Sequence, residues 1–154
     1  MGRSIMQETR ECYLCRKEAT KNGYYGQLRT YQLHRHHVIF GRGYRELSEK
    51  YGLWVYLCQK HHTEGQDSVH KNKKVNVALR IEAEKAFLRE HTFQEWMQLF
   101  TRNYLDENEI NRIMTEQRAM SETKNTETKP SEAKKTLENR IMTKAPPDGF
   151  FFIE

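Results

Sequence analysis

One stretch of the sequence is the most informative about the fold and the chemistry of this chain: Leu33-His34-Arg35-His36-His37-Val38-Ile39-Phe40-Gly41. It is preceded by Cys12-x-x-Cys15 and followed by Cys58-x-x-His61-His62. Thiolate and imidazole are the preferred ligands of Zn²⁺, and imidazole is also the commonest general base near neutral pH. The pattern therefore indicates a structural metal clamp and a reactive centre within one part of the chain.

The cysteines predict the clamp. Structural zinc is commonly held by two knuckles that each supply two ligands, and Cys12 with Cys15 and Cys58 with His61 have that spacing. We expect a Cys₃His zinc site at these four residues. A redox pair at Cys12 and Cys15 is an alternative, but no βαβ pattern surrounds it and it leaves the second pair without a role. Unliganded cysteines are a further alternative. The three cysteines indicate metal ligands in a reducing compartment rather than a disulfide framework.

Once the clamp has taken its ligands, His36, His37, His62 and His70 remain for chemistry. Adjacent residues on a strand point to opposite faces, so we expect different roles for His36 and His37, one on a metal and the other aimed at a water molecule. A helix after His62 could carry His70 back towards the same metal. The alternative for each histidine is surface or core filling, which is the interpretation adopted for His34 and His91.

The pattern of apolar residues predicts an α+β domain. We expect a knuckle turn over Glu11–Ala19, strands over Gln32–Phe40 and Leu53–Leu57, and a short helix over Tyr44–Tyr51 that ends at Gly52. A polar segment over Thr63–Asn72 is expected to open into a helix. Helical spacing over Lys73–Glu90 predicts one C-terminal helix, and Thr92 with Glu95 at capping-box spacing predicts the start of another.

The composition changes after Leu105, which divides the chain into a domain at residues 1–105 and a polar tail at residues 106–154 that is expected to be largely disordered. Thr123–Leu137 contains Pro130 and almost no apolar residues, so it is predicted to be disordered. The aromatic end, Phe150–Ile153, could dock in a groove of a protein partner, or it could have no role.

The charge is uneven. The whole chain has a formal net charge of +5. Residues 1–105 carry 18 Lys and Arg against 11 Asp and Glu, whereas residues 106–154 carry 8 against 10. A basic domain with a near-neutral tail is compatible with DNA or RNA binding, although many small basic proteins bind neither. No apolar run approaches the roughly 18–20 residues that span a bilayer, and no signal peptide is evident, so we expect no membrane partner and a cytoplasmic location.

The order of these motifs resembles the HNH family of ββα-metal (His-Me finger) endonucleases, and in particular its small members encoded in phage and prophage genomes. The resemblance covers roughly residues 10–75 and rests on His36-His37-Val38, the strand at Leu53–Leu57 and Cys58-Gln59-Lys60-His61-His62. It implies a ββα-metal finger core framed by the zinc knuckles, in a protein that acts on DNA in a bacterial host cell.

The resemblance also implies roles. His37 would be the catalytic base, and His36, His62 and His70 would bind a catalytic divalent cation (Mg²⁺, Mn²⁺ or Zn²⁺). The expected activity is hydrolysis of DNA phosphodiester bonds with low sequence specificity. The residues expected to contact DNA phosphates are basic and close to these histidines in sequence: Arg35, Arg42, Arg45, Lys50, Lys60, Lys71, Lys73 and Lys74.

One position departs from the HNH pattern. The family's middle residue, usually Asn, fixes the loop that holds the base, and Leu53 stands in its place. This departure favours the alternative function, a zinc-stabilised DNA-binding or recombination accessory protein without catalytic activity.

Overall fold

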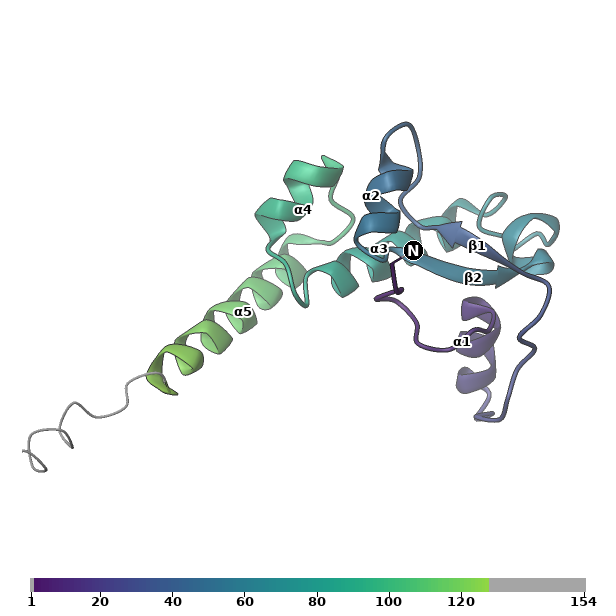
Figure 1. Ribbon diagram of the computed structural model, residues 1–154, viewed down its shortest axis with the longest axis horizontal. Helices are drawn as coiled ribbons and strands as arrows, with labels where there is room; N and C mark the ends of the chain where they lie inside the picture. Colours follow the sequence, from purple (N-terminus) through teal and green to yellow (C-terminus); the bar gives the residue numbers. More distant parts are fainter. Residues whose placement is uncertain (1, 128–154) are drawn as a thin grey trace, which may run out of the picture. The chain divides into compact units, whose positions relative to one another are not determined.

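A computed structural model of the protein describes residues 2–127 and combines helices with a small sheet (Figure 1). The elements, in chain order, are α1 (Tyr13–Lys21), β1 (Leu33–His37), α2 (Tyr44–Lys50), β2 (Trp54–Cys58), the π-helix η1 (Lys60–Glu64), α3 (Lys73–Phe87), α4 (Phe93–Phe100) and α5 (Glu107–Glu127). The predicted α+β class is therefore confirmed. Residues Met1–Met114 form one compact unit and Thr115–Glu154 a second. None of the helices in the described part of the chain has the length and apolar character needed to cross a lipid bilayer.

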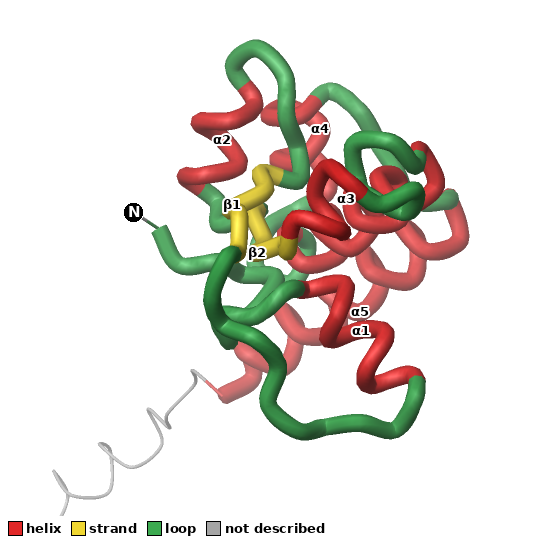
Figure 2. Tube along the Cα trace, turned by 90° about the vertical axis from the view of Figure 1, so that its right-hand side faces the viewer, coloured by secondary structure: helices red, strands yellow, loops and turns green. Residues whose placement is uncertain are grey.

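The two strands pair antiparallel, with His36 opposite Val55 and His37 opposite Trp54. Because directly paired residues share a face of the sheet, His36 lies on the face of Val55, which is fully buried. His37 lies on the other face with Trp54. In Figure 2 the strands lie at the centre, with α2 and α3 on opposite sides and α1 below them.

The hydrophobic core joins the inner face of the sheet to α3 and α4. Its largest fully buried side chains include Trp96, Phe87, Leu53 and Leu57. The start of α4 has the predicted capping box: Thr92 Oγ1 accepts from the Glu95 N–H at 3.2 Å, and the Glu95 carboxylate accepts from the Thr92 N–H at 2.7 Å. This core packs against the face of the sheet that carries Val55 and Leu57.

Two local predictions are wrong. Glu11–Ala19 is not a knuckle turn, because residues 13–21 contain no Gly or Pro and form α1, with Cys12 as its N-cap residue. Two residues three apart lie on one helix face, so Cys12 and Cys15 still point the same way. The other concerns Thr63–Asn72, which does not itself open into a helix: the π-helix η1 ends at Glu64, turns follow, and α3 begins only at Lys73.

The predicted tail also begins differently. Residues 106–127 include the helix α5 rather than disordered chain. Asp106 Oδ1 accepts from the Glu109 N–H at 2.9 Å at its start, and Ile110 and Ile113 pack against the core, so the compact unit extends beyond Leu105. Most of the Thr123–Leu137 segment and all of Phe150–Ile153 lie outside the described residues.

Two candidate metal centres

The structure brings Cys12, Cys15, Cys58 and His61 together, with all four candidate ligand atoms within 4.8 Å of one another. We call this group the cysteine cluster. The Sγ atoms of Cys15 and Cys58 lie 3.8 Å apart, and His61 Nδ1 lies 3.3 Å from the Sγ atoms of both Cys12 and Cys15. A tetrahedral zinc ion with Zn–S bonds of about 2.3 Å would separate two sulfurs by roughly 3.8 Å. The cluster could therefore hold a metal ion and is compatible with structural zinc.

A carboxylate orients the imidazole of this cluster. His61 is buried, its Nδ1 faces the three sulfurs, and its Nε2 lies 3.2 Å from Oε1 of Glu18 on α1. A metal-binding histidine typically donates its other ring N–H to a carboxylate, which fixes its tautomer and raises its basicity as a ligand. Glu18 follows Cys15 by one helical turn, so α1 supplies both a thiol and the carboxylate that supports the fourth candidate ligand.

The environment of the three thiols suits a cation. Burial raises the pKa of Cys12 and of Cys15, and the neighbouring sulfurs add to the rise at Cys15. Burial also opposes ionisation of Cys58, but hydrogen bonds led by the backbone N–H of His61 outweigh it and lower the pKa of that thiol. A divalent cation would remove the repulsion between the sulfurs and favour all three as thiolates.

The second group, the histidine cluster, consists of His36, His62 and His70, whose candidate ligand atoms also lie within 4.8 Å of one another. They come from β1, from η1 and from the turn before α3. Their ring centroids are 4.9 to 5.4 Å apart, and the Nε2 atoms of His62 and His70 are separated by 3.3 Å. The chain thus converges three imidazoles on one small volume.

Two hydrogen bonds to the backbone of Val69 hold the turn that carries His70. The Val69 N–H donates to the His61 carbonyl at 2.9 Å, and Asn76 Nδ2 donates to the Val69 carbonyl at 3.1 Å. The turn therefore rests on η1 on one side and on α3 on the other. Consecutive residues of η1, His61 and His62, belong to the two different clusters.

His36 is the most unusual member of the histidine cluster. It is only 4% exposed, and among the described residues its Nε2 has no hydrogen-bond partner. Burial lowers its pKa to about 3, reinforced by the charges of His62 and His70, so the ring is neutral near pH 7. Burial and His70 also lower the pKa of His62. A buried neutral imidazole with an unpaired nitrogen costs free energy unless something accepts its lone pair, and a metal ion does so.

His37 lies apart from this cluster, as the alternation of strand residues predicts. Its Nε2 is 2.8 Å from Oε2 of Glu49 on α2, and Arg35 donates to the other oxygen of Glu49 at 2.6 Å. The hydrogen bond with His37, helped by Arg35 and opposed by burial, lowers the pKa of Glu49. Arg35, His37 and Glu49 line an open cavity of about 740 Å³ together with Arg45, Glu46 and Tyr56.

Leu53 is a core residue with no exposed surface, so it cannot perform the role of the Asn that the resemblance calls for. The loop between the strands is fixed in another way. Ser48, also fully buried, donates from Oγ to the Ile39 carbonyl at 2.5 Å, and the Leu53 backbone pairs with Val38 and with Ser48. Nothing in the spacing of the sequence marks Ser48 for this task.

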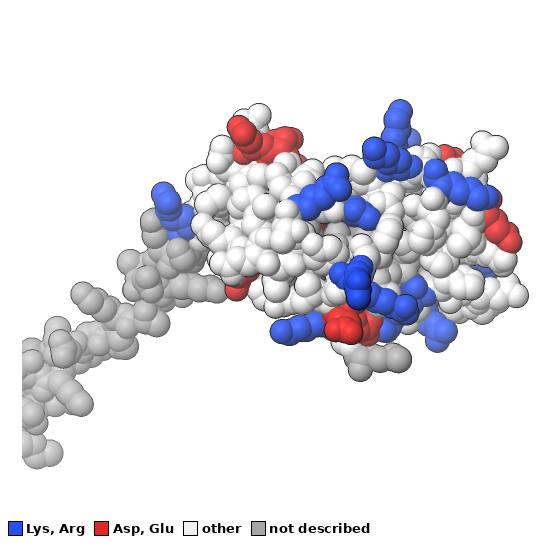
Figure 3. Space-filling model, turned by 90° about the horizontal axis from the view of Figure 1, so that it is seen from above, with Lys and Arg blue, Asp and Glu red and all other residues white. Residues whose placement is uncertain are grey.

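The eight basic residues proposed to contact DNA differ in their surroundings. Arg35 is half-buried, pairs with Glu49 and lies 3.8 Å from the ring centre of Trp54, so part of its charge is already neutralised. Lys71 donates to the Glu64 carbonyl. All except Arg35 are exposed: Arg42, Arg45, Lys50, Lys60, Lys71, Lys73 and Lys74. Figure 3 shows Lys and Arg side chains scattered over the face of the molecule seen from above, with acidic side chains next to them at the lower edge.

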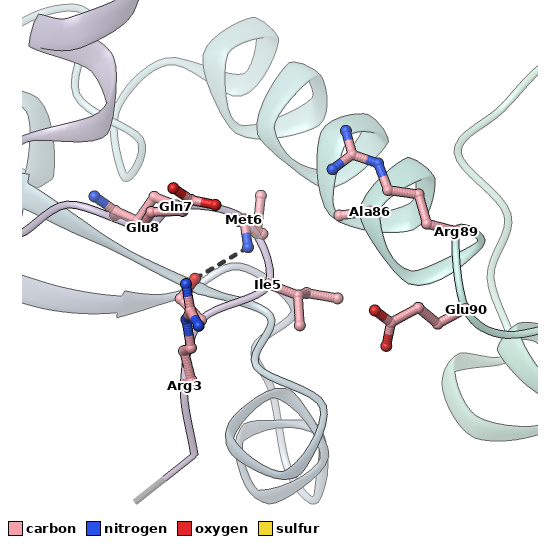
Figure 4. Close-up of a pocket in the computed structure, with 9 residues that line it drawn as sticks. Arg3, Ile5, Met6, Gln7, Glu8, Ala86, Arg89 and Glu90 are labelled. Atoms are coloured by element: carbon pink, nitrogen blue, oxygen red, sulfur yellow. Dashed lines mark hydrogen bonds between the residues drawn. The ribbon is translucent and has the colours of Figure 1, made fainter.

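Another cavity, of about 360 Å³, lies between the N-terminal segment and the end of α3, where Figure 4 shows Arg3, Glu8, Arg89 and Glu90 around it. None of the predicted site residues lines it.

Three residues that support the candidate sites were not predicted from the sequence: Glu18, Ser48 and Glu49. Of these, only Glu18 carries a signal in the sequence, since it lies on the face of Cys15 once residues 13–21 are taken as a helix.

Comparison with known proteins yields no matching family model, no similar curated protein and no similar solved structure at a significant level.

Proposed function

We propose that this chain is an HNH-type endonuclease that hydrolyses DNA phosphodiester bonds with the help of a divalent cation and with low sequence specificity. The observation that carries the proposal is the histidine cluster, in which a buried, neutral His36 presents an unpaired Nε2 beside two further imidazoles. Three converging imidazoles form a typical site for a catalytic transition-metal ion that keeps a position open for substrate.

The surrounding elements support the same proposal. The paired strands β1 and β2, followed by η1 and α3, would correspond to the ββα-metal core of HNH enzymes. The cysteine cluster would bind zinc and fasten α1 to the end of β2, which a domain of this size needs because its core is small. The exposed basic residues around β1 and α2 would attract the phosphate backbone.

The bound cation would polarise the scissile phosphate and stabilise charge on the leaving 3′ oxygen. The chain's own residues then handle the proton. Glu49 holds Nε2 of His37, so Nδ1 is the atom that takes a proton from the attacking water. As it does so, the oxygen of the water bonds to phosphorus and the bond between phosphorus and the 3′ oxygen breaks. The 3′ oxygen takes a proton from solvent, and His37 returns its own to solvent. His36 and His37 lie on opposite faces of β1, so the phosphodiester would cross the end of the strand to meet both rings.

Glu49 is a positioning residue in this scheme. Its carboxylate fixes the tautomer of His37 and stabilises the imidazolium that forms, and Arg35 holds the carboxylate in turn. Glu46 lines the same cavity from the same helix and is not paired with His37 in the described contacts, so it provides a matched control.

The test is nicking of supercoiled plasmid by the full chain with Mg²⁺, Mn²⁺ or Zn²⁺. His37→Gly should lose roughly 10²- to 10⁴-fold in rate, the usual contribution of a general base, and should regain activity with added imidazole. His36→Ala should lose nicking without such rescue, because the cation site itself is lost. Glu49→Gln should nick more slowly, whereas Glu46→Gln should match the wild type. Wild-type nicking rates in His37→Gly would refute the assigned base.

A second function is favoured by Leu53 and by the separation of His37 from the histidine cluster. In that case the chain is a zinc-stabilised DNA-binding or recombination accessory protein without catalytic activity. It predicts salt-sensitive DNA binding and bound zinc in a protein that fails to nick plasmid with any of the three cations.

A further inference from the structure

The loop between α1 and β1, residues 22–32, exposes three aromatic rings. Tyr24, Tyr25 and Tyr31 expose 51%, 76% and 63% of their surfaces, more than any other large hydrophobic residue in the described part of the chain. We call this segment the tyrosine loop. Three exposed aromatic side chains within one loop of eleven residues suggest a binding surface.

The charge around the tyrosine loop favours an anionic partner. From residue 19 to residue 45 the sequence contains no Asp or Glu. The same stretch contains five cationic residues, Lys21, Arg29, Arg35, Arg42 and Arg45, of which Arg35 is already paired with Glu49. Within the loop itself, the guanidinium of Arg29 lies over the ring of Tyr31, 5.2 Å from its centre, so a cation stacks on one face of this aromatic side chain.

The tyrosine loop is also anchored. Arg16 donates to the Gly26 carbonyl at 2.8 Å, and the Tyr24 N–H donates to the Ala19 carbonyl at 2.8 Å. Leu28 and Arg29 line a cavity of about 180 Å³ with the three cysteines. The two hydrogen bonds tie Tyr24 and Gly26 to α1, which reduces the entropy lost when the loop binds a partner.

The tyrosine loop leads directly into the strand that carries the histidine cluster. Tyr31 precedes His34 by three residues, a span of at most about 10 Å in extended chain. His34 is exposed and stacks on His62, with ring centroids 5.3 Å apart. A polynucleotide whose phosphate lies at the histidine cluster would therefore pass over His34 towards Tyr31.

We propose that the tyrosine loop binds unpaired bases, and that the preferred substrate of this chain contains single-stranded DNA beside the bond that is cut. Bases of a duplex already stack on one another, whereas unpaired bases offer their faces to aromatic side chains regardless of sequence. Arg29 and the neighbouring cations would neutralise the phosphates between the stacked bases. This inference rests on the proposed endonuclease function and names its substrate class.

The test compares binding of a labelled single strand and of the matching duplex to the full, zinc-loaded chain, by fluorescence anisotropy at one salt concentration with no free Mg²⁺, Mn²⁺ or Zn²⁺. In the double variant Tyr25→Ala/Tyr31→Ala, the Kd for the single strand should rise roughly 5- to 150-fold for each stacked base lost. The Kd for the duplex should stay near the wild-type value. The matched control Tyr25→Phe/Tyr31→Phe keeps the rings and should bind both probes like the wild type. Equal zinc content and equal thermal unfolding of the variants show that the fold is intact.

Unchanged single-strand binding in the alanine variant would overturn the proposal, and so would an equal loss for the duplex or for the phenylalanine variant. Plasmid nicking by the same variants keeps the two proposals separate. An alanine variant that nicks normally and binds single strands normally removes the role of the tyrosine loop alone. A wild-type chain that binds single strands through the loop but never nicks removes the nuclease proposal alone.

Discussion

Glu84 on α3 is a carboxyl group without exposed surface, and it makes the stability of the domain depend on pH. One oxygen, Oε2, accepts from the Tyr104 N–H at 2.7 Å, while among the described residues Oε1 has no partner. Burial raises the pKa of Glu84 from its ordinary 4.5 to about 7, although the backbone N–H groups of Tyr104 and Leu105 favour its charged form. The folded chain therefore binds this proton more tightly than the unfolded chain does.

The sign and the size of the effect follow from linkage. A carboxyl whose pKa is raised on folding stabilises the fold fully below pH 4.5, and that stabilisation is lost as the pH rises to 7. A rise of about 2.5 pKa units at 1.36 kcal/mol each corresponds to about 3 kcal/mol of unfolding free energy. Glu84→Gln removes the titration while its amide oxygen can still accept from Tyr104. The variant should therefore gain about 3 kcal/mol relative to the wild type between pH 4 and pH 8.

Urea unfolding of both proteins at several pH values, with zinc present throughout, measures this difference. Taking variant minus wild type cancels the titration of the cysteines and histidines, which both proteins share. A difference that stays constant from pH 4 to pH 8 would show that Glu84 does not titrate with a raised pKa and would refute the reasoning.

Two further predictions concern the supports of the candidate sites. Glu18→Gln should weaken zinc binding at the cysteine cluster about tenfold. This is the low end of the range for loss of a supporting carboxylate, because Glu18 is largely exposed. Competition with a chelating dye measures the affinity, and an unchanged value would mean that Glu18 does not orient His61. Ser48→Ala leaves the buried Ile39 carbonyl without its side-chain donor and should cost about 1–3 kcal/mol in urea unfolding; an equally stable variant would show that the loop between the strands is held by its backbone contacts alone.

The sequence was a good guide wherever spacing alone decides geometry. The alternation of strand residues separates His36 from His37, and the structure shows this separation because one faces the histidine cluster and the other faces Glu49. The capping box at Thr92 needs only two residues three apart, and it forms as predicted. The grouping of Cys12, Cys15, Cys58 and His61 also follows from paired ligand spacing, whatever the local backbone.

What could not be predicted depends on contacts distant in sequence. Glu49 reaches His37 only because α2 folds back over the outer face of the sheet, and no periodicity marks it among the other glutamates. The spacing of Cys12 and Cys15 indicated a knuckle turn, but the residues of α1 are ordinary helix formers and form a helix. The start of α5 was missed because its composition is polar, and it is held by the packing of Ile110 and Ile113 on a core that local sequence does not show.

His61 and His62 lie on the same single turn, η1, so the order of one side chain depends on the order of the other. These neighbouring residues belong to two separate candidate metal sites, so a metal ion that orders the ring of His61 also positions the ring of His62. By the reciprocity of linked equilibria, occupation at either place would then strengthen occupation at the other. Under the proposed function, removal of zinc from the cysteine cluster would therefore weaken the binding of a cation at the histidine cluster.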